Sequence, residues 1–240
     1  MRYYLTRAKK ILYLFTDFRA LTYFLKFRVL PTIEHHYVLS ILPNTVIDIG
    51  ANKGQFALAV ELFTAAKVIS FEPLTHAAIT CKEMFDNNDR HTIINAAIAP
   101  QSGRLNLHVS KSDDSSSLLE IGPNQTNLFP GTQEVRQETV TCGPLSEFIT
   151  KEDLHGTVLL KIDVQGYELE ALKGCSELLS EIDIIYCECS FIELYKDQCS
   201  IKELMAFLDS WGYEIAGVYN TLYSKAGRAI QSDFLFVRSS

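Results

Sequence analysis

The sequence has no pair of cysteines spaced as Cys-x-x-Cys and no apolar run as long as a membrane-spanning helix needs. The six cysteines show no disulfide framework, and Cys187 and Cys189 alternate along an apolar run, which predicts reduced thiols on one face of a core strand. No secretory signal with a cleavage site is evident. These absences favour a cytoplasmic protein in a reducing compartment.

Basic residues are scarce beyond the first thirty positions. Residues 1–30 contain seven Lys or Arg and one Asp, a net charge of +6, whereas the remainder contains 15 basic and 28 acidic residues, a net charge of −13. An acidic body of this kind argues against general nucleic-acid binding. The basic charge of the protein is therefore concentrated at its N-terminal end.

The N-terminal segment is aromatic as well as basic. Apolar residues at 5, 8, 12 and 15, and then at 18, 21 and 25, follow helical spacing, and Pro31 is expected to end this helical region. We predict a helical appendage over 1–43 and a main domain over 44–240. A helical hairpin that packs on the domain as a lid or homodimer element is the favoured role. The alternative is peripheral contact of 1–30 with the inner membrane surface, since basic and aromatic side chains suit anionic lipid headgroups.

The stretch 44–73 carries the first functional pattern. An apolar run over 45–49, a glycine turn over 50–54, a helical pattern and a second apolar run ending at Glu72 indicate a βαβ unit of a parallel sheet. Ligands bind such sheets at the carboxyl ends of the strands. The glycine turn should leave free N–H groups at the start of the helix, and Glu72 is placed to accept hydrogen bonds from the hydroxyls of a ribose.

The glycine spacing separates the possible cofactors. The turn reads Gly-Ala-Asn-Lys-Gly-Gln and does not match the Gly-x-Gly-x-x-Gly spacing of a dinucleotide site. Asp48 would repel a pyrophosphate but would suit an ammonium group, and S-adenosylmethionine offers an ammonium, a ribose and a carboxylate. A general nucleotide-binding α/β fold with an incidental acid and an NAD-dependent oxidoreductase are the alternatives at this point.

A second pattern lies over 157–188. One apolar run ends at Asp163, a turn and a helix follow, and another apolar run leads to Glu188. Both acids should project into the cleft that Asp48 and Glu72 line, because each is expected to end a strand. We predict that Asp163 or Glu188 is a general base, with capping of the 164–166 turn or binding of a divalent cation as alternatives for this pair. No metal site is assigned.

Two irregular stretches are candidates for binding the acceptor. The chain loses its periodicity from 110 to 133, where a long loop in a compact domain is usually a binding loop or a solvated insertion. Between two expected strands, the stretch 220–231 contains Tyr223, Lys225 and Arg228, and it is expected to form a roof over a substrate.

Three motifs resemble a known family: VIDIGANKGQF from Val46, FEP from Phe71 and LKIDVQGYELEALKG from Leu160 are similar to the FkbM-type S-adenosylmethionine-dependent methyltransferases. The resemblance runs from about residue 45 to 237. It implies a Rossmann-like class I α/β fold with a seven-stranded, mostly parallel sheet and an antiparallel last strand. It also implies methyl transfer to a hydroxyl of a small molecule or glycan, such as a sugar or a polyketide-like acceptor. A non-catalytic cofactor-binding scaffold is the alternative. The expected cofactor contacts are Asp48, Gly50, Ala51, Asn52, Gly54, Phe56, Glu72 and Pro73. Asp163, Gly166 and Glu168 match the third motif, but the resemblance does not itself fix their roles.

Overall fold

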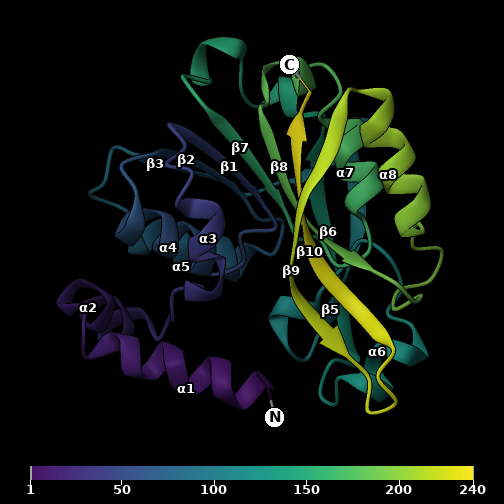
Figure 1. Ribbon diagram of the computed structural model, residues 1–240, viewed down its shortest axis with the longest axis horizontal. Helices are drawn as coiled ribbons and strands as arrows, with labels where there is room; N and C mark the ends of the chain where they lie inside the picture. Colours follow the sequence, from purple (N-terminus) through teal and green to yellow (C-terminus); the bar gives the residue numbers. More distant parts are fainter. Residues whose placement is uncertain (1, 240) are drawn as a thin grey trace.

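The computed structural model describes residues 2–239, with side chains described from Ala8 onward. Seven strands form one sheet in the order β3-β2-β1-β7-β8-β10-β9 (Figure 1). All neighbours are parallel except β10, which is antiparallel to both β8 and β9. The predicted mostly parallel sheet with an antiparallel last strand is therefore confirmed. The strands are β1 (Thr45–Ile49), β2 (Lys67–Phe71), β3 (His91–Ile94), β7 (Val158–Ile162), β8 (Ile184–Ser190), β9 (Tyr213–Tyr223) and β10 (Ala229–Arg238).

Helices cover both faces of this sheet, which is why its central strands are apolar runs rather than alternating ones. All five residues of β1 are buried. On one face, Val46 packs with Leu58 of α4 (Gln55–Phe63) and with the end of α5 (Thr75–Met84). On the other face, Ile47 shares a cluster with α7 (Glu168–Gly174) and α8 (Ile201–Ser210). Cys187 and Cys189 lie in this second cluster as free thiols, as predicted.

The N-terminal segment is helical and packs on the α4 face (Figure 1). It consists of α1 (Arg2–Leu14), α2 (Phe18–Phe27), the 3-10 turn η1 (Ile33–His35) and α3 (His36–Leu39). Asp17 caps α2 by accepting hydrogen bonds from the backbone N–H groups of Arg19 and Ala20, at 2.8 and 3.4 Å. The helix ends at Phe27, where Arg28 adopts a left-handed conformation, and not at Pro31 as expected.

A second, smaller sheet lies beside the first, in the order β4-β6-β5. It contains β4 (Ala97–Ile98), β5 (Gly103–Ser110) and β6 (Glu134–Gly143). The sequence predicts the strands near 105–109 and 134–141 but not that they form a separate sheet. The remaining short elements are η2 (Asp113–Ser115), α6 (Pro123–Leu128), η3 (Leu145–Glu147), η4 (Lys151–Asp153) and η5 (Leu179–Glu181).

The expected roof over 220–231 is wrong. Strand β9 continues to Tyr223 and β10 begins at Ala229, so only 224–228 connect them. The two strands pair along most of their length as an antiparallel hairpin, and this ladder satisfies the backbone groups that a loop would leave free. Tyr223, Lys225 and Arg228 lie at the end of this hairpin and do not line the cleft described below.

Among residues 2–239, no helix has the length and apolar character needed to span a bilayer.

Candidate functional site

A cleft of about 560 Å³, open to solvent, lies at the carboxyl ends of the central strands, where β1 has β2 on one side and β7 on the other. Its walls come from three parts of the chain: the segments that follow these strands (with Gly50, Glu72 and Asp163), the start of the small sheet, and the segment 113–118. The irregular stretch 110–133 thus contributes to the cleft as a binding loop would.

The glycine turn after β1 shapes the floor of the cleft. Gly50 and Gly54 have φ of +84° and +85°, a conformation that glycine adopts without strain. A Cβ on Gly54 would lie 2.7 Å from the Met84 side chain and 2.8 Å from the Cys81 sulfur, so this glycine allows α4 to pack against α5. Gly54 therefore acts on the shape of the turn, and it does not line the cleft.

The N–H groups of the turn itself, over residues 50–54, are bonded within the protein, whereas the expectation concerned the start of the helix that follows. The N–H groups of Gly50 and Ala51 both donate to the carbonyl oxygen of Phe71 at 3.0 Å, and that of Gly54 donates to Ala51. The amide of Asn52 donates to Glu72 at 2.7 Å. The Lys53 amide donates to the Asn52 side chain as well, at 2.6 Å. The turn is thus held in place by the protein itself, mainly through Phe71 and Glu72 at the end of β2.

Glu72 holds the turn from the end of β2. One carboxylate oxygen accepts the Asn52 N–H and the other accepts the Leu74 N–H at 2.8 Å. Burial raises the pKa of Glu72 to about 7, although both hydrogen bonds act to lower it. Pro73 follows it on the cleft wall. Each carboxylate oxygen has a second lone pair, so Glu72 can accept further hydrogen bonds from a ligand.

Asp48 does not line the cleft, contrary to expectation. It lies inside β1 and is fully buried, with its Oδ1 3.1 Å from the ammonium nitrogen of Lys161. The same nitrogen donates to the carbonyl oxygen of Gly50 at 3.2 Å and lies 3.8 Å from Asp163. Burial acts to lower the pKa of Lys161, but the carboxylates of Asp48 and Asp163 outweigh it and raise this pKa. Lys161 therefore holds a buried positive charge between β1 and β7.

Phe56 also lies beneath the cleft and not on its wall. Its ring is buried in the α4 face, 5.7 Å from the Lys161 ammonium, and forms an edge-on contact with His35 of the N-terminal segment. Its place at the first turn of α4 directs it toward the sheet. The residue supports the Lys161 pair and has no contact with the cleft.

The turn of the third motif is held by Glu168. Its carboxylate accepts hydrogen bonds from the N–H groups of Gly166 at 2.9 Å and Val164 at 3.3 Å. Burial raises the pKa of Glu168 to about 7. Gln165 and Gly166 have φ of +57° and +97°, so two successive residues are left-handed. Capping of this turn therefore belongs to Glu168, and Asp163 remains partly exposed on the cleft wall.

Gln165 joins the two proposed bases. Its side-chain amide donates to Asp163 at 2.7 Å and to Glu188 at 3.2 Å, and its oxygen accepts the Tyr195 hydroxyl at 2.7 Å. Gln231 donates to the other oxygen of Glu188 at 2.6 Å. Burial raises the pKa of Glu188 well above its usual range, and the negative charge of Asp163 adds to the effect.

The expected position of Glu188 at a strand end is wrong. Strand β8 continues to Ser190, and Glu188 pairs in register with Asp233 of β10. The ladder with β10 keeps the strand extended past the acid. Glu188 therefore lies behind Gln165, and of the four acids only Glu72 and Asp163 line the cleft.

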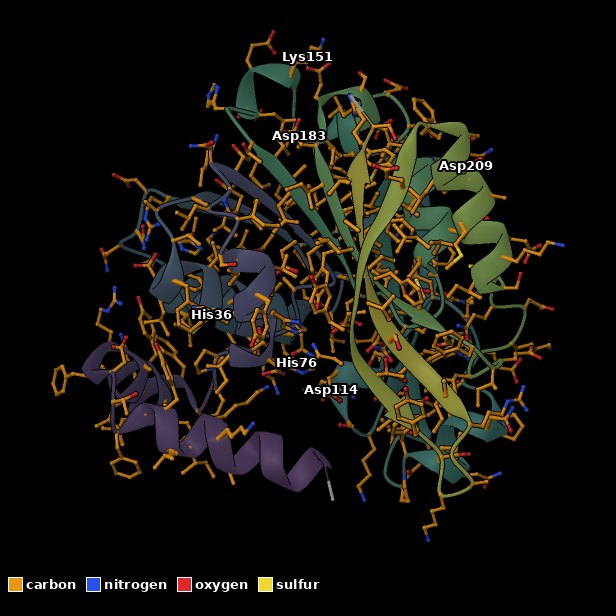
Figure 2. The ribbon with its side chains drawn as sticks, in the orientation of Figure 1. His36, His76, Asp114, Lys151, Asp183 and Asp209 are labelled. Atoms are coloured by element: carbon orange, nitrogen blue, oxygen red, sulfur yellow. The ribbon has the colours of Figure 1, made fainter. Side chains whose placement is uncertain are left out.

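A clasp that the sequence does not reveal holds the segment 113–118 over the cleft. Asp113 accepts from Lys53 of the glycine turn at 2.8 Å and lies 3.0 Å from the Nε2 of His76 on α5. His76 and Asp114, the residue after Asp113, are labelled in Figure 2. Partial burial acts to raise the pKa of Asp113, but the hydrogen bonds from His76 and Lys53 lower it. The contact spans 60 residues of sequence, and two adjacent aspartates in a loop were its only local signal.

Within the described part of the chain, no three His, Cys, Asp or Glu side chains gather closely enough to hold a metal ion.

The sheet order, with a cleft at the carboxyl ends of its central strands, matches the Rossmann-like class I methyltransferase fold that the resemblance implies. The family model of the methyltransferase FkbM domain matches residues 48–215, well over half of the chain. The chain therefore belongs to this family of methyltransferases.

The chain is similar to the 2-O-methyltransferase NoeI of Sinorhizobium fredii, at 29% identity over 74% of this chain and 77% of the relative. It is also similar to the hexuronic acid methyltransferase AglP of Haloferax volcanii, at 27% identity over 59% of this chain and 54% of that protein. The chain thus spans about half the length of the second relative. Among solved structures, it is similar to magnesium protoporphyrin IX methyltransferase from Synechocystis with SAM bound, at 14% identity over 87% of this chain and 81% of that one, with a TM-score of 0.46.

Proposed function

We propose that the protein transfers a methyl group from S-adenosylmethionine to a hydroxyl oxygen of a sugar or glycan. The observation that carries the proposal is the cleft itself, with Glu72 on one wall and Asp163 beside Gln165 on another. The names of the two relatives, a 2-O-methyltransferase and a hexuronic acid methyltransferase, support a sugar acceptor.

The residues of the cleft fit S-adenosylmethionine. Glu72 offers carboxylate lone pairs for ribose hydroxyls, while Gly50, Asn52 and Pro73 shape the wall beside it. Apolar side chains such as Phe71 and Ile98 line the cleft and suit a flat base. When bound, the cofactor supplies an activated methyl group on its sulfonium. Asp48 and Lys161 support the turn from below, and the ammonium of the cofactor is therefore not assigned to Asp48.

Asp163 and Gln165 suit the acceptor. Carboxylates and amides are strong hydrogen-bond partners for hydroxyl groups, and these two side chains hold each other in place at 2.7 Å on the cleft wall. We assign to Asp163 the role of the base that takes the proton of the acceptor hydroxyl. Of the two proposed bases, Asp163 and Glu188, it is the one that lines the cleft. Glu188, whose pKa is raised by burial, positions Gln165 from behind.

All six cysteines are free thiols, which supports a reducing compartment, and we place the activity in the cytoplasm.

Purified protein, labelled S-adenosylmethionine and a panel of neutral sugars and uronic acids would test this function. We expect release of S-adenosylhomocysteine with at least one sugar and methylation at a hydroxyl in the product. Cofactor binding without turnover on any sugar, but with turnover on a non-sugar hydroxyl, would overturn the acceptor class. Binding without turnover on any acceptor would support the scaffold alternative, and preferential binding of NAD would contradict the cofactor.

A further inference from the structure

The N-terminal helices leave one apolar face uncovered. Five large apolar side chains of this region are exposed. On α1 and just after it they are Ile11 (44% exposed), Leu12 (67%) and Phe15 (77%), and on α2 they are Phe18 (82%) and Leu25 (60%). We call these five residues the outer apolar face. They follow the spacing of one side of each helix, and Figure 1 shows both helices at the periphery of the molecule, away from the sheet. Large apolar side chains that are exposed together on one side of a helix are candidates for an interaction site.

The exposure of this face does not come from loose packing of the helices. On their inner side, Leu14 and Ala20 are buried in the same cluster as α4, and Tyr13 packs on Phe63 with 5.7 Å between ring centroids. Arg19 donates to the carbonyl oxygen of Leu62 at 3.1 Å. The helices are thus fixed on the body by one side and present the other side to the surroundings.

The two helices that carry the outer apolar face also carry exposed basic side chains. Lys9, Lys26 and Arg28 are exposed, and Lys26 lies 4.8 Å from the ring of Phe27. Arg19 is not counted among them, because its guanidinium is bonded to Leu62 and Asp17. The only acid within 1–30 is Asp17, which caps α2. Large apolar side chains with flanking cations are the composition of helices that lie in a lipid headgroup region.

We propose that the outer apolar face binds the surface of an anionic lipid bilayer, with the exposed phenylalanines inserted between headgroups and the flanking cations on lipid phosphates. Charge selects this occupant over a second copy of the chain. A two-fold dimer through this face would bring the same basic patch opposite itself, whereas an anionic bilayer is complementary to it. This surface activity is independent of the proposed methyl transfer, so either can fail alone.

Vesicle sedimentation tests the proposal. The full-length protein should sediment with phosphatidylcholine vesicles that contain phosphatidylserine and not with phosphatidylcholine alone, and added salt should weaken the binding. A Phe15→Ser, Phe18→Ser double variant should bind at least about tenfold more weakly, since two large apolar side chains no longer enter the bilayer. Tyr223→Ser, which removes an exposed aromatic residue from the far hairpin, should bind like the wild type.

Two further measurements keep the result interpretable. The double variant should keep the wild-type melting temperature and affinity for S-adenosylmethionine, because neither phenylalanine contacts the core or the cleft. Light scattering of the wild type without lipid should give the mass of a monomer. Equal sedimentation of wild type and double variant would overturn the proposal. So would a wild-type dimer that the double variant converts to a monomer, because a second copy would then cover the face.

Discussion

Gly50 and Asp163 meet where the two halves of the sheet join: a Cβ on Gly50 would overlap the carbonyl oxygen of Asp163. The turn that faces the proposed cofactor and the segment that carries the proposed base therefore touch through their backbones. The ammonium of Lys161 lies beneath both, within hydrogen-bond distance of Gly50 and 3.8 Å from Asp163. The two sides of the cleft are held at a fixed separation by this contact and do not depend on a ligand for it.

Gly50→Ala should therefore lower the free energy of unfolding by more than the strain of its left-handed backbone conformation alone. Gly227 has nearly the same φ, +80° against +84°, but nothing lies near its Cβ position, which makes Gly227→Ala a matched control. We expect the control to lose about 1–2 kcal/mol of unfolding free energy from the backbone conformation alone. Gly50→Ala should lose roughly a further 1–3 kcal/mol because the backbone of Asp163 must move. Urea denaturation measures both, and equal losses would contradict the contact.

The glycine turn and the main sheet were predictable because their signals are local: short apolar runs, glycines and acids at regular distances along the chain. The role of Lys161 was not, since a lysine inside an apolar run shows no partner until β1 and β7 lie side by side. The clasp between Lys53 and Asp113 joins residues 60 positions apart, and no periodicity connects them. The predicted position of Glu188 at a strand end was wrong for a similar reason. Strand β8 ends where its pairing with β10 ends, and not where its apolar run ends.

Glu72→Ala should weaken binding of S-adenosylmethionine by roughly 1.5–3 kcal/mol, the scale of hydrogen bonds to a charged group. Calorimetry would measure the affinity, with Glu83→Ala on the exposed side of α5 as the control. Equal affinities in wild type and Glu72→Ala would contradict the assignment of Glu72 to the ribose hydroxyls of the cofactor.

The raised pKa of Glu72 has opposite effects on binding and on folding. Wild-type affinity for the cofactor should fall as the pH drops below about 7, because protonation removes an acceptor, and Glu72→Ala should not show this fall. The folded state holds the proton more tightly than the unfolded chain does. Its contribution to stability is therefore complete below pH 4.5 and is lost as the pH rises to about 7. Urea midpoints across this range should decline less in Glu72→Ala than in wild type.

Asp113→Asn should open the clasp over the cleft. The pair with Lys53 is partly exposed and so contributes only about 0.5–1 kcal/mol. We expect the cofactor to dissociate about two- to fivefold faster, with little change in melting temperature, and the difference should shrink at high salt. Stopped-flow release of the cofactor is the measurement. Glu120→Gln, which removes an exposed ion pair with Lys196 that does not line the cleft, should leave the release rate unchanged.

Leu14→Ala and Leu12→Ala should separate the two sides of α1. Leu14 is buried against the α4 face, so its truncation should cost about 2–5 kcal/mol of stability. Leu12 lies on the outer apolar face, and its truncation should change stability by no more than about 0.5 kcal/mol. Thermal unfolding compares them. Equal melting temperatures would mean that the appendage does not pack on the body in solution.

Asp163→Asn should lower kcat by about a hundredfold to ten-thousandfold while the affinity for S-adenosylmethionine changes little, because the amide keeps the shape of the side chain and cannot take the acceptor's proton. Glu188→Gln should lower kcat less, since Glu188 reaches the cleft only through the Gln165 amide. Its effect should resemble that of Tyr195→Phe, which releases the other end of Gln165.

Asp209→Asn on the exposed side of α8 is the control for a surface charge (Figure 2). Activity that a chelator abolishes and a divalent cation restores would favour a metal role for Asp163 and Glu188. Near wild-type turnover in both amide variants would move the base to another group of the cleft. The segment 113–118 would then be the place to search for it, because it brings Asp113 and Asp114 to the wall.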